Sequence, residues 1–235
     1  MLWPGHGAGS ACGKALGGVP ATTLAYEKLA NWAFQVKTED AFVAEVLAGQ
    51  PEPPKYFKEM KRVNKTGPAI LGGFREPARL AGDSVERVVR GDTSVVDCRS
   101  GAEVAAGFIP GTLTIPLGKS FPTWAGALLP YDRPIHLIAT NAGTAARAAR
   151  MLAMIGLDDV RGWLGRDALQ AWVTRNGELE PTPQVTVHEM LERTKAGAAQ
   201  VLDVRGLAEW TAGHVPGALH VPLGDLASRA GVLRR

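Results

Sequence analysis

Short apolar runs alternate with helix-like stretches through the middle of the chain. Residues 95–96 and 135–139 are apolar runs that end at polar residues, and another run begins at Val160. Residues 145–155 have strong helix propensity and one apolar face, and residues 167–174 also have a helical pattern. Because strands that alternate with helices form parallel sheets, the pattern predicts an α/β fold with a mainly parallel sheet flanked by helices.

An internal repeat extends this pattern. Residues 201–224 match residues 95–118 at a constant offset of 106, and 13 of the 24 positions are identical. Both copies contain an apolar run, a helical turn and a Gly-x-(Ile/Val)-Pro-Gly turn, in which proline fixes φ and glycine accepts a positive φ. So long an offset indicates duplication of a whole domain. We expect a complete domain over residues 76–180 and the front half of a second over residues 184–235.

Each apolar run of the repeat ends in an Asp-x-Arg motif. Its members are Asp97 and Arg99 in the first copy and Asp203 and Arg205 in the second. Charged side chains at the end of a buried strand need partners nearby. We expect each pair to order its own turn rather than to perform chemistry.

Residues 1–73 do not match the repeat. They open with a glycine-rich segment, and residues 21–35, 39–47 and 55–65 have helical composition. The proline-rich residues 50–54 separate the second helical stretch from the third.

Composition and charge exclude several classes of function. The net charge is +3, and no long basic run is present, so nucleic acid is not expected as a partner. No apolar run approaches the roughly 20 residues that span a bilayer, and the start of the chain has no secretory pattern. Two cysteines, Cys12 and Cys98, are too few for a disulfide scaffold. We expect a cytoplasmic protein without a membrane partner; the sequence indicates no oligomeric state.

The motifs of the repeat resemble those of rhodanese-type sulfurtransferase domains. The resemblance rests on the Asp-x-Arg strand end, the Gly-His-Val-Pro-Gly-Ala turn at 213–218 and the strand–loop–helix pattern around Gly143, with Gly162 and Trp172 further on. It implies a rhodanese-like fold for the complete copy and a partial rhodanese-like domain for the second.

The same resemblance locates the residue that should carry sulfur. Rhodaneses use a low-pKa cysteine at the start of a six-residue loop, and the loop N–H groups and the following helix stabilise the anion. Alignment on Gly143 places Thr140 at the cysteine position and Ala145 at a following arginine position. Since a threonine hydroxyl does not carry sulfane sulfur, the first copy is predicted to be silent, although its loop could bind an anion. The degenerate loop consists of Thr140, Asn141, Ala142, Gly143, Thr144 and Ala145. The corresponding position of the second copy would lie beyond residue 235.

Residues 1–73 resemble the C-terminal tail of metallo-β-lactamase-fold persulfide dioxygenases. The resemblance rests on the Pro-Gly-His motif at 4–6 and the Gln-Pro-Glu-Pro-Pro-Lys-Tyr-Phe segment at 50–57, and it matches His6 to the last metal-site histidine of that fold. The early His-x-His-x-Asp-His motif of the family is absent. Because one histidine does not hold a metal, we expect no cofactor in this chain. For the complete parent protein the resemblance implies Fe (or Zn) and small sulfane-sulfur substrates.

Three hypotheses follow. The first is a fragment of a persulfide dioxygenase–sulfurtransferase fusion that is catalytically silent on its own. The second is a non-catalytic rhodanese-like module that binds a partner or a sulfur anion. The third is an intact enzyme that uses Cys12 or Cys98, although Cys98 fits a small buried apolar residue and Cys12 fits a structural loop.

Overall fold

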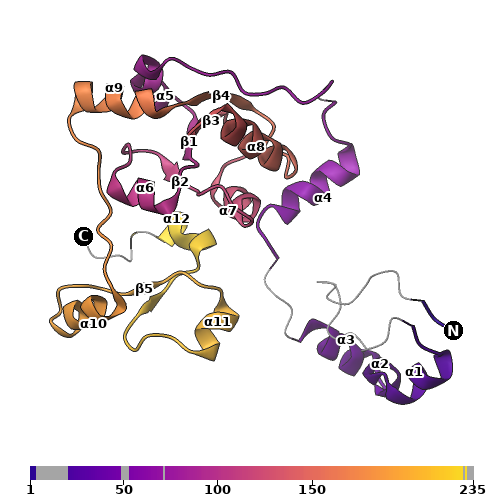
Figure 1. Ribbon diagram of the computed structural model, residues 1–235. Coiled ribbons are helices and arrows are strands. Elements are labelled where there is room, and N and C mark those ends of the chain that lie inside the picture. The colour runs from indigo at the N-terminus through magenta and orange to yellow at the C-terminus, as the bar shows by residue number, and fades with distance from the viewer. Residues whose placement is uncertain (4–20, 49–52, 71, 230, 232–235) are drawn as a thin grey trace. The chain divides into compact units, whose positions relative to one another are not determined.

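A computed structural model of the protein describes residues 1–3, 21–48, 53–70, 72–229 and 231 (Figure 1). The chain divides into two compact units, Met1–Glu52 and Pro53–Arg235. The sequence pattern groups residues 53–73 with the N-terminal region, but in the structure this segment belongs to the same unit as the repeats. Among the described helices, none is long and apolar enough to cross a membrane.

The first unit contains short helices with largely exposed side chains. The single helix predicted over residues 21–35 is wrong, because Asn31 has an extended backbone that ends one helix and begins the next. The Asn31 side chain accepts a hydrogen bond from the backbone N–H of Ala33 at 3.0 Å, as an N-cap does. The prediction over residues 39–47 is confirmed. The helices are α1 (Leu24–Ala30), α2 (Trp32–Gln35) and α3 (Glu39–Leu47).

The second unit is built around a parallel sheet, which confirms the predicted fold class. The strand order is β2-β1-β3-β4, and every neighbouring pair is parallel. The strands are β1 (Ser94–Asp97), β2 (Leu113–Thr114), β3 (Ile135–Ile138) and β4 (Val160–Leu164). Around them lie α4 (Phe57–Thr66), η1 (Gly82–Ser84), α5 (Val85–Val89), α6 (Gly101–Ala106), α7 (Phe121–Leu128), α8 (Ala142–Ala153) and α9 (Arg166–Asn176).

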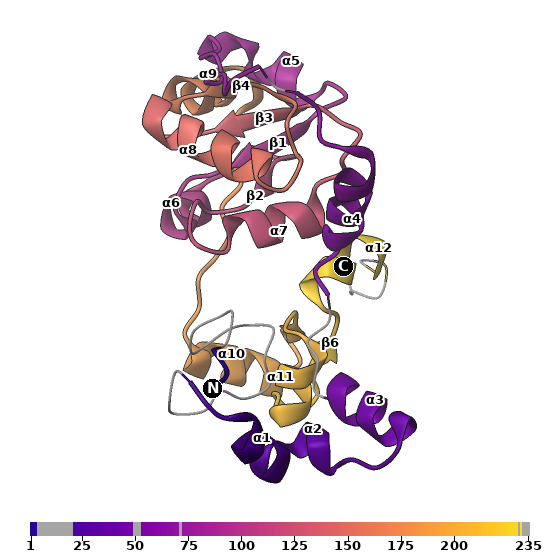
Figure 2. The same ribbon diagram turned by 90° about the vertical axis from the view of Figure 1, so that its right-hand side faces the viewer.

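Side chains of the central strands alternate between two apolar cores. Val96 and Leu137 belong to the core that contains residues of α7 and α8. Val95 and Ile138 belong to the other core, which contains residues of α5 and α9 such as Trp172. The two views show α5 and α9 next to each other (Figures 1 and 2). Because both faces of the sheet are covered, apolar side chains of the central strands β1 and β3 are buried on both faces.

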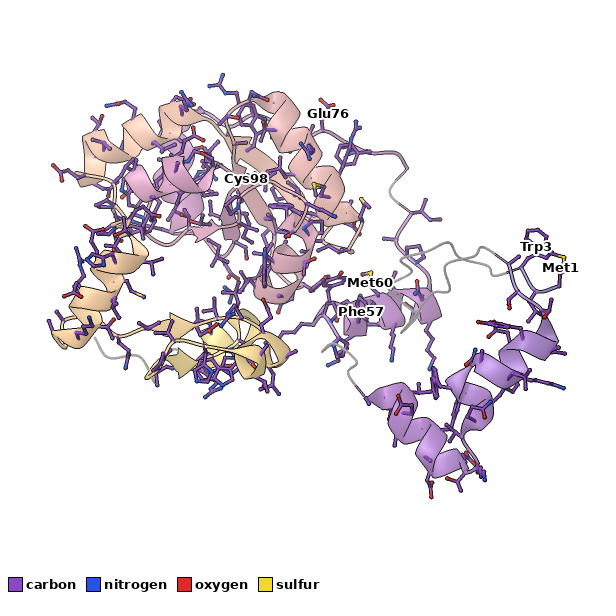
Figure 3. All side chains as sticks on the ribbon, turned by 60° about the horizontal axis from the view of Figure 1, so that its bottom comes forward. Met1, Trp3, Phe57, Met60, Glu76 and Cys98 are labelled. Carbon is purple, nitrogen blue, oxygen red and sulfur yellow. The ribbon has the colours of Figure 1, made fainter. Side chains whose placement is uncertain are left out.

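Helix α4 and the residue before it pack closely against two glycines of the complete domain. A Cβ atom on Gly126 would lie 2.6 Å from the ring of Tyr56, and one on Gly156 would lie 3.3 Å from the end of Met60. Figure 3 shows Phe57 and Met60 on this helix. These contacts explain why residues 53–73 join the second unit.

The second repeat reproduces the first half of this fold. Leu202 pairs with Leu219 in a parallel two-stranded sheet, as Val96 pairs with Leu113 in the first repeat, at the same offset of 106. The Pro-Gly turn also has the same geometry in the two repeats: φ is 79° at Gly217 and 88° at Gly111. The elements are α10 (Val187–Lys195), β5 (Leu202–Asp203), α11 (Leu207–Ala212), β6 (Leu219–His220), η2 (Leu223–Asp225) and α12 (Leu226–Arg229).

Candidate functional site

The residue that occupies the predicted sulfur-carrier position lies at the carboxyl end of the sheet. Thr140 is exposed and follows β3, directly before helix α8. A depression of about 450 Å³ opens there; it is lined by Arg79, Thr140, Asn141, Ala142, Trp163, Gly165, Arg166 and Asp167. The carboxyl edge of a parallel α/β sheet is where such folds usually bind ligands.

The predicted six-residue loop is much shorter in the structure. Helix α8 begins at Ala142, three residues before the expected start, because Asn141 caps it. The Asn141 side chain accepts hydrogen bonds from the backbone N–H and from the hydroxyl of Thr144, at 2.9 and 3.2 Å. The hydroxyls of Thr140 and Thr144 are also within hydrogen-bonding distance, 3.2 Å. The hydroxyls of Thr140 and Thr144 and the N–H of Thr144, which could otherwise have faced a bound anion, therefore take part in hydrogen bonds within this segment.

Ala145 does not lie in a loop at all. Its side chain is fully buried in the core between the sheet and helix α8. The alignment on Gly143 assigns Ala145 to the degenerate loop, whereas in the structure it belongs to α8, because the helix begins three residues earlier than expected. An arginine here would place a charge in the apolar core.

Both cations of the depression already have carboxylate partners. Arg79 donates to Asp167 at 3.0 Å and lies 5.6 Å from the centre of the Trp163 ring. Arg166 donates to Glu103 at 2.9 Å. Hydrogen bonds from Ser100, followed by the nearby Arg166 guanidinium, lower the pKa of Glu103 below its ordinary value. Both arginine side chains remain more than half exposed.

Cys98 is a buried core residue, as the sequence predicts. Its side chain is 3% exposed and packs in the core that also contains Val96 (Figure 3). Burial, followed by the adjacent Asp97 carboxylate, raises the pKa of the thiol far above its ordinary value. Since the thiolate is the nucleophile, this cysteine is unsuited to sulfur transfer. Cys12 and His6 lie outside the described residues.

The Asp-x-Arg pairs form the same clamp in both repeats. Arg99 donates to Asp97 at 2.6–3.1 Å and to the carbonyl oxygen of Gly107 at 2.9 Å. In the second repeat, Arg205 donates to Asp203 and to Gly213 with nearly identical distances. Each clamp ties a strand end to the end of the following helix.

An aromatic stack in the second repeat was not predicted. The ring of Trp210 stacks with that of His214, with ring centres 3.5 Å apart, and with that of His220, with ring centres 4.6 Å apart. Each imidazole also makes a hydrogen bond with a backbone carbonyl oxygen, of Trp210 and Arg205 respectively. The nearer contact joins Trp210 of α11 to His214, four residues on and just past the end of the helix, whereas the second contact depends on the β5–β6 pairing.

Metal ligands are not gathered in the described part of the chain. No group of three or more His, Cys, Asp or Glu side chains there could hold a metal ion. Structural and catalytic metal sites need at least three such donors. The residues that the structure describes therefore do not supply the ligands of an iron or zinc centre.

Comparisons with known proteins agree with the fold. Residues 186–233 match the model of the rhodanese-like domain. An HTH-type transcriptional regulator of Mycobacterium tuberculosis is 43% identical over 49 residues, which are 21% of this chain and 22% of that protein.

Two solved structures are similar to parts of the chain. A metallo-beta-lactamase from Staphylococcus aureus is 36% identical, with a TM-score of 0.51, over 70% of this chain and 44% of that chain. A rhodanese-like domain from Anabaena sp. is 21% identical, with a TM-score of 0.34, over 41% of this chain and 99% of that domain. The chain spans less than half of the length of the mycobacterial and staphylococcal proteins. It contains a rhodanese-like domain, and its structural neighbours are metallo-beta-lactamase and rhodanese-domain proteins.

Proposed function

We propose that this chain is a rhodanese-domain protein of persulfide metabolism whose complete repeat does not carry sulfur. The observation that carries the proposal is Thr140 at the carboxyl end of β3, where a sulfur carrier would need a thiolate. A hydroxyl group does not form a persulfide.

Two further features of the complete repeat support catalytic silence. The Asn141 cap occupies the backbone N–H of Thr144 at the start of α8. A persulfide anion would need donors of this kind to be free. The cysteine of this repeat, Cys98, is buried in the core and its thiol remains protonated at neutral pH.

The relation to persulfide dioxygenase–sulfurtransferase fusions belongs to the same proposal. It is supported by the match to a metallo-beta-lactamase over 70% of the chain, together with the rhodanese-like domain at residues 186–233. We assign no iron or zinc chemistry to the described residues, because they do not supply a ligand set. Sulfane-sulfur compounds are the proposed substrates of a complete protein of this type.

The second candidate function is a non-catalytic binding module. The depression beside Thr140 favours it, since Arg79 and Arg166 line it and both side chains, although paired with Asp167 and Glu103, remain more than half exposed. In that role the domain would bind an anion or a partner without forming a covalent bond.

A sulfurtransferase assay with thiosulfate and cyanide tests the proposal. The wild-type chain should give only the background rate, and Cys98→Ser should leave that rate unchanged. Activity that disappears in Cys98→Ser would refute the silent-repeat proposal.

A restored thiol separates the two candidate functions. Thr140→Cys places a thiol at the exposed carrier position, whereas Thr144→Cys is a matched control within the same hydrogen-bonded cluster. Selective persulfide formation on Thr140→Cys would support a degenerate sulfur-carrier site. Equal persulfide formation on the two variants would show that position 140 is not specially suited to carry sulfur. That result would favour the non-catalytic binding module.

A further inference from the structure

Helix α4 carries a narrow stripe of positive charge. Lys58, Lys61, Arg62 and Lys65 occupy positions i, i+3, i+4 and i+7, so they lie on one face of the helix. All four side chains are exposed. The stripe spans about 10 Å along the helix axis.

The opposite face of α4 holds the helix on the domain. Met60 and Val63 are partly buried, and Met60 packs beside Gly156 (Figure 3). Tyr56, just before the helix, packs beside Gly126. Since Met60 and Val63 face the domain, the helix presents its charged face to solvent, and Phe57 at its first turn is its one exposed large apolar side chain, too little for insertion into a lipid bilayer.

Three charges of the stripe are unbalanced. Arg62 forms an ion pair with Glu59 at 2.8 Å. In the described part of the chain, Lys58, Lys61 and Lys65 have no ion pair and no side-chain hydrogen bond. Seven of the ten arginines between residues 76 and 180 have carboxylate partners; they are Arg79, Arg90, Arg99, Arg133, Arg150, Arg161 and Arg166.

The three neighbouring lysines destabilise helix α4 by charge repulsion. Lys61 lies three residues after Lys58 and four residues before Lys65, and like charges at such spacings repel. An anionic partner that lay along the stripe would remove this repulsion.

We propose that the lysine stripe, Lys58, Lys61 and Lys65, is a docking surface for an acidic segment of a partner protein. Carboxylates spaced one helical turn apart would match the spacing of the three ammonium groups. Nucleic acid is disfavoured because the stripe is long enough for only a few phosphates, and the net charge of the chain is only +3. The attraction would be weak and sensitive to salt, as exposed ion pairs are.

Fluorescence anisotropy with the full chain tests the proposal. The probe is a fluorescein-labelled helical peptide that carries glutamates at successive i, i+4 positions. The triple variant Lys58→Gln/Lys61→Gln/Lys65→Gln should bind this peptide about tenfold more weakly at low salt. The matched control Lys28→Gln/Lys37→Gln/Lys195→Gln removes three exposed lysines elsewhere and should keep the affinity of the wild-type chain.

Two additional readouts make the outcome decisive. The thermal midpoint of the stripe variant should equal or exceed that of the wild-type chain, because a repulsion has been removed. Absence of peptide binding at low salt, or an equal loss in the control variant, would overturn the proposal. Stripe-dependent binding of single-stranded DNA or of phosphatidylserine vesicles, without binding of the acidic peptide, would overturn it as well.

Discussion

The two repeats share a local clamp but differ in what surrounds it. Arg99 and Asp97 are 7% and 0% exposed, whereas Arg205 and Asp203, with the same hydrogen bonds, are 43% and 9% exposed. The clamp therefore forms from local sequence, without the complete sheet. Burial of the clamp, by contrast, requires strands β3 and β4 and the helices that follow them. The comparison separates the interactions that a short motif specifies from those that a complete domain adds.

The clearest way to break this comparison is to remove the same carboxylate in each repeat. Asp97→Asn should lower the free energy of unfolding by about 3–5 kcal/mol, because it leaves the buried Arg99 guanidinium without its partner. Asp203→Asn should leave the main unfolding transition unchanged, since Arg205 can be hydrated. Urea denaturation of both variants measures the difference, and equal losses would show that the environments of the clamps are equivalent.

A matched pair of apolar truncations tests the cores of the repeats. Ile109 is fully buried and its counterpart Val215 is 37% exposed. Ile109→Ala should destabilise the chain by about 2–5 kcal/mol, through lost apolar contacts and a cavity. Val215→Ala should change stability by less than about 0.5 kcal/mol. A comparable loss at Val215 in urea melts would mean that this side chain is covered.

Hydrogen exchange sharpens the comparison at the level of single amides. The N–H of Leu117 donates to Cys98 at 3.2 Å, and the N–H of its counterpart Leu223 donates to Val204 at 2.9 Å. We expect the amide of Leu117 to exchange at least about tenfold more slowly than that of Leu223. Breaking the Leu117 hydrogen bond requires opening part of the larger, four-stranded sheet. NMR measures both rates in one sample, and equal protection would contradict a difference in local stability.

Acid should affect the repeats at different pH values. Burial, followed by Arg87 and Arg161, lowers the pKa of His136 below its ordinary value of 6.5. The unfolded chain therefore takes up this proton first, so stability is retained above about 6.5 and falls as the pH decreases below that value. His136→Gln should flatten this part of the stability profile. An unchanged profile would exclude His136 as the group responsible.

The carboxylate of the second repeat provides the contrast. Hydrogen bonds from Arg205 lower the pKa of Asp203 to about 2 from its ordinary value of 3.8. Its contribution to stability should be complete above about 3.8 and should decline as the pH falls towards 2. A titration of the Asp203 side-chain carbon by NMR measures this pKa directly, and a value near 3.8 would show that the second clamp is not formed.

Sequence patterns predict the sheet and the clamps because both depend on short-range signals. Apolar runs give β1, β3 and β4, and the Asp-x-Arg spacing brings its two side chains together. Helix boundaries depend on single caps that compete with helix propensity. Asn31 breaks a predicted helix, and Asn141 starts α8 early enough to bury Ala145. Such competition is hard to judge from composition.

Contacts between distant segments are the part that the sequence leaves undetermined. The stack of His220 on Trp210 depends on strand pairing, and the packing of Tyr56 beside Gly126 joins positions 70 residues apart. No local periodicity marks either contact. Thr140 is different, because the resemblance to rhodanese domains, aligned on Gly143, assigns it to the carrier position without any contact between distant segments.

Intact-protein mass spectrometry gives the most direct test of sulfur transfer. The full chain is incubated with thiosulfate, examined for the mass of one added sulfur atom, and examined again after cyanide. We predict no sulfur adduct on the wild-type chain that cyanide removes and thiosulfate restores. A cysteine that gains and loses one sulfur atom repeatedly in these steps would contradict the account.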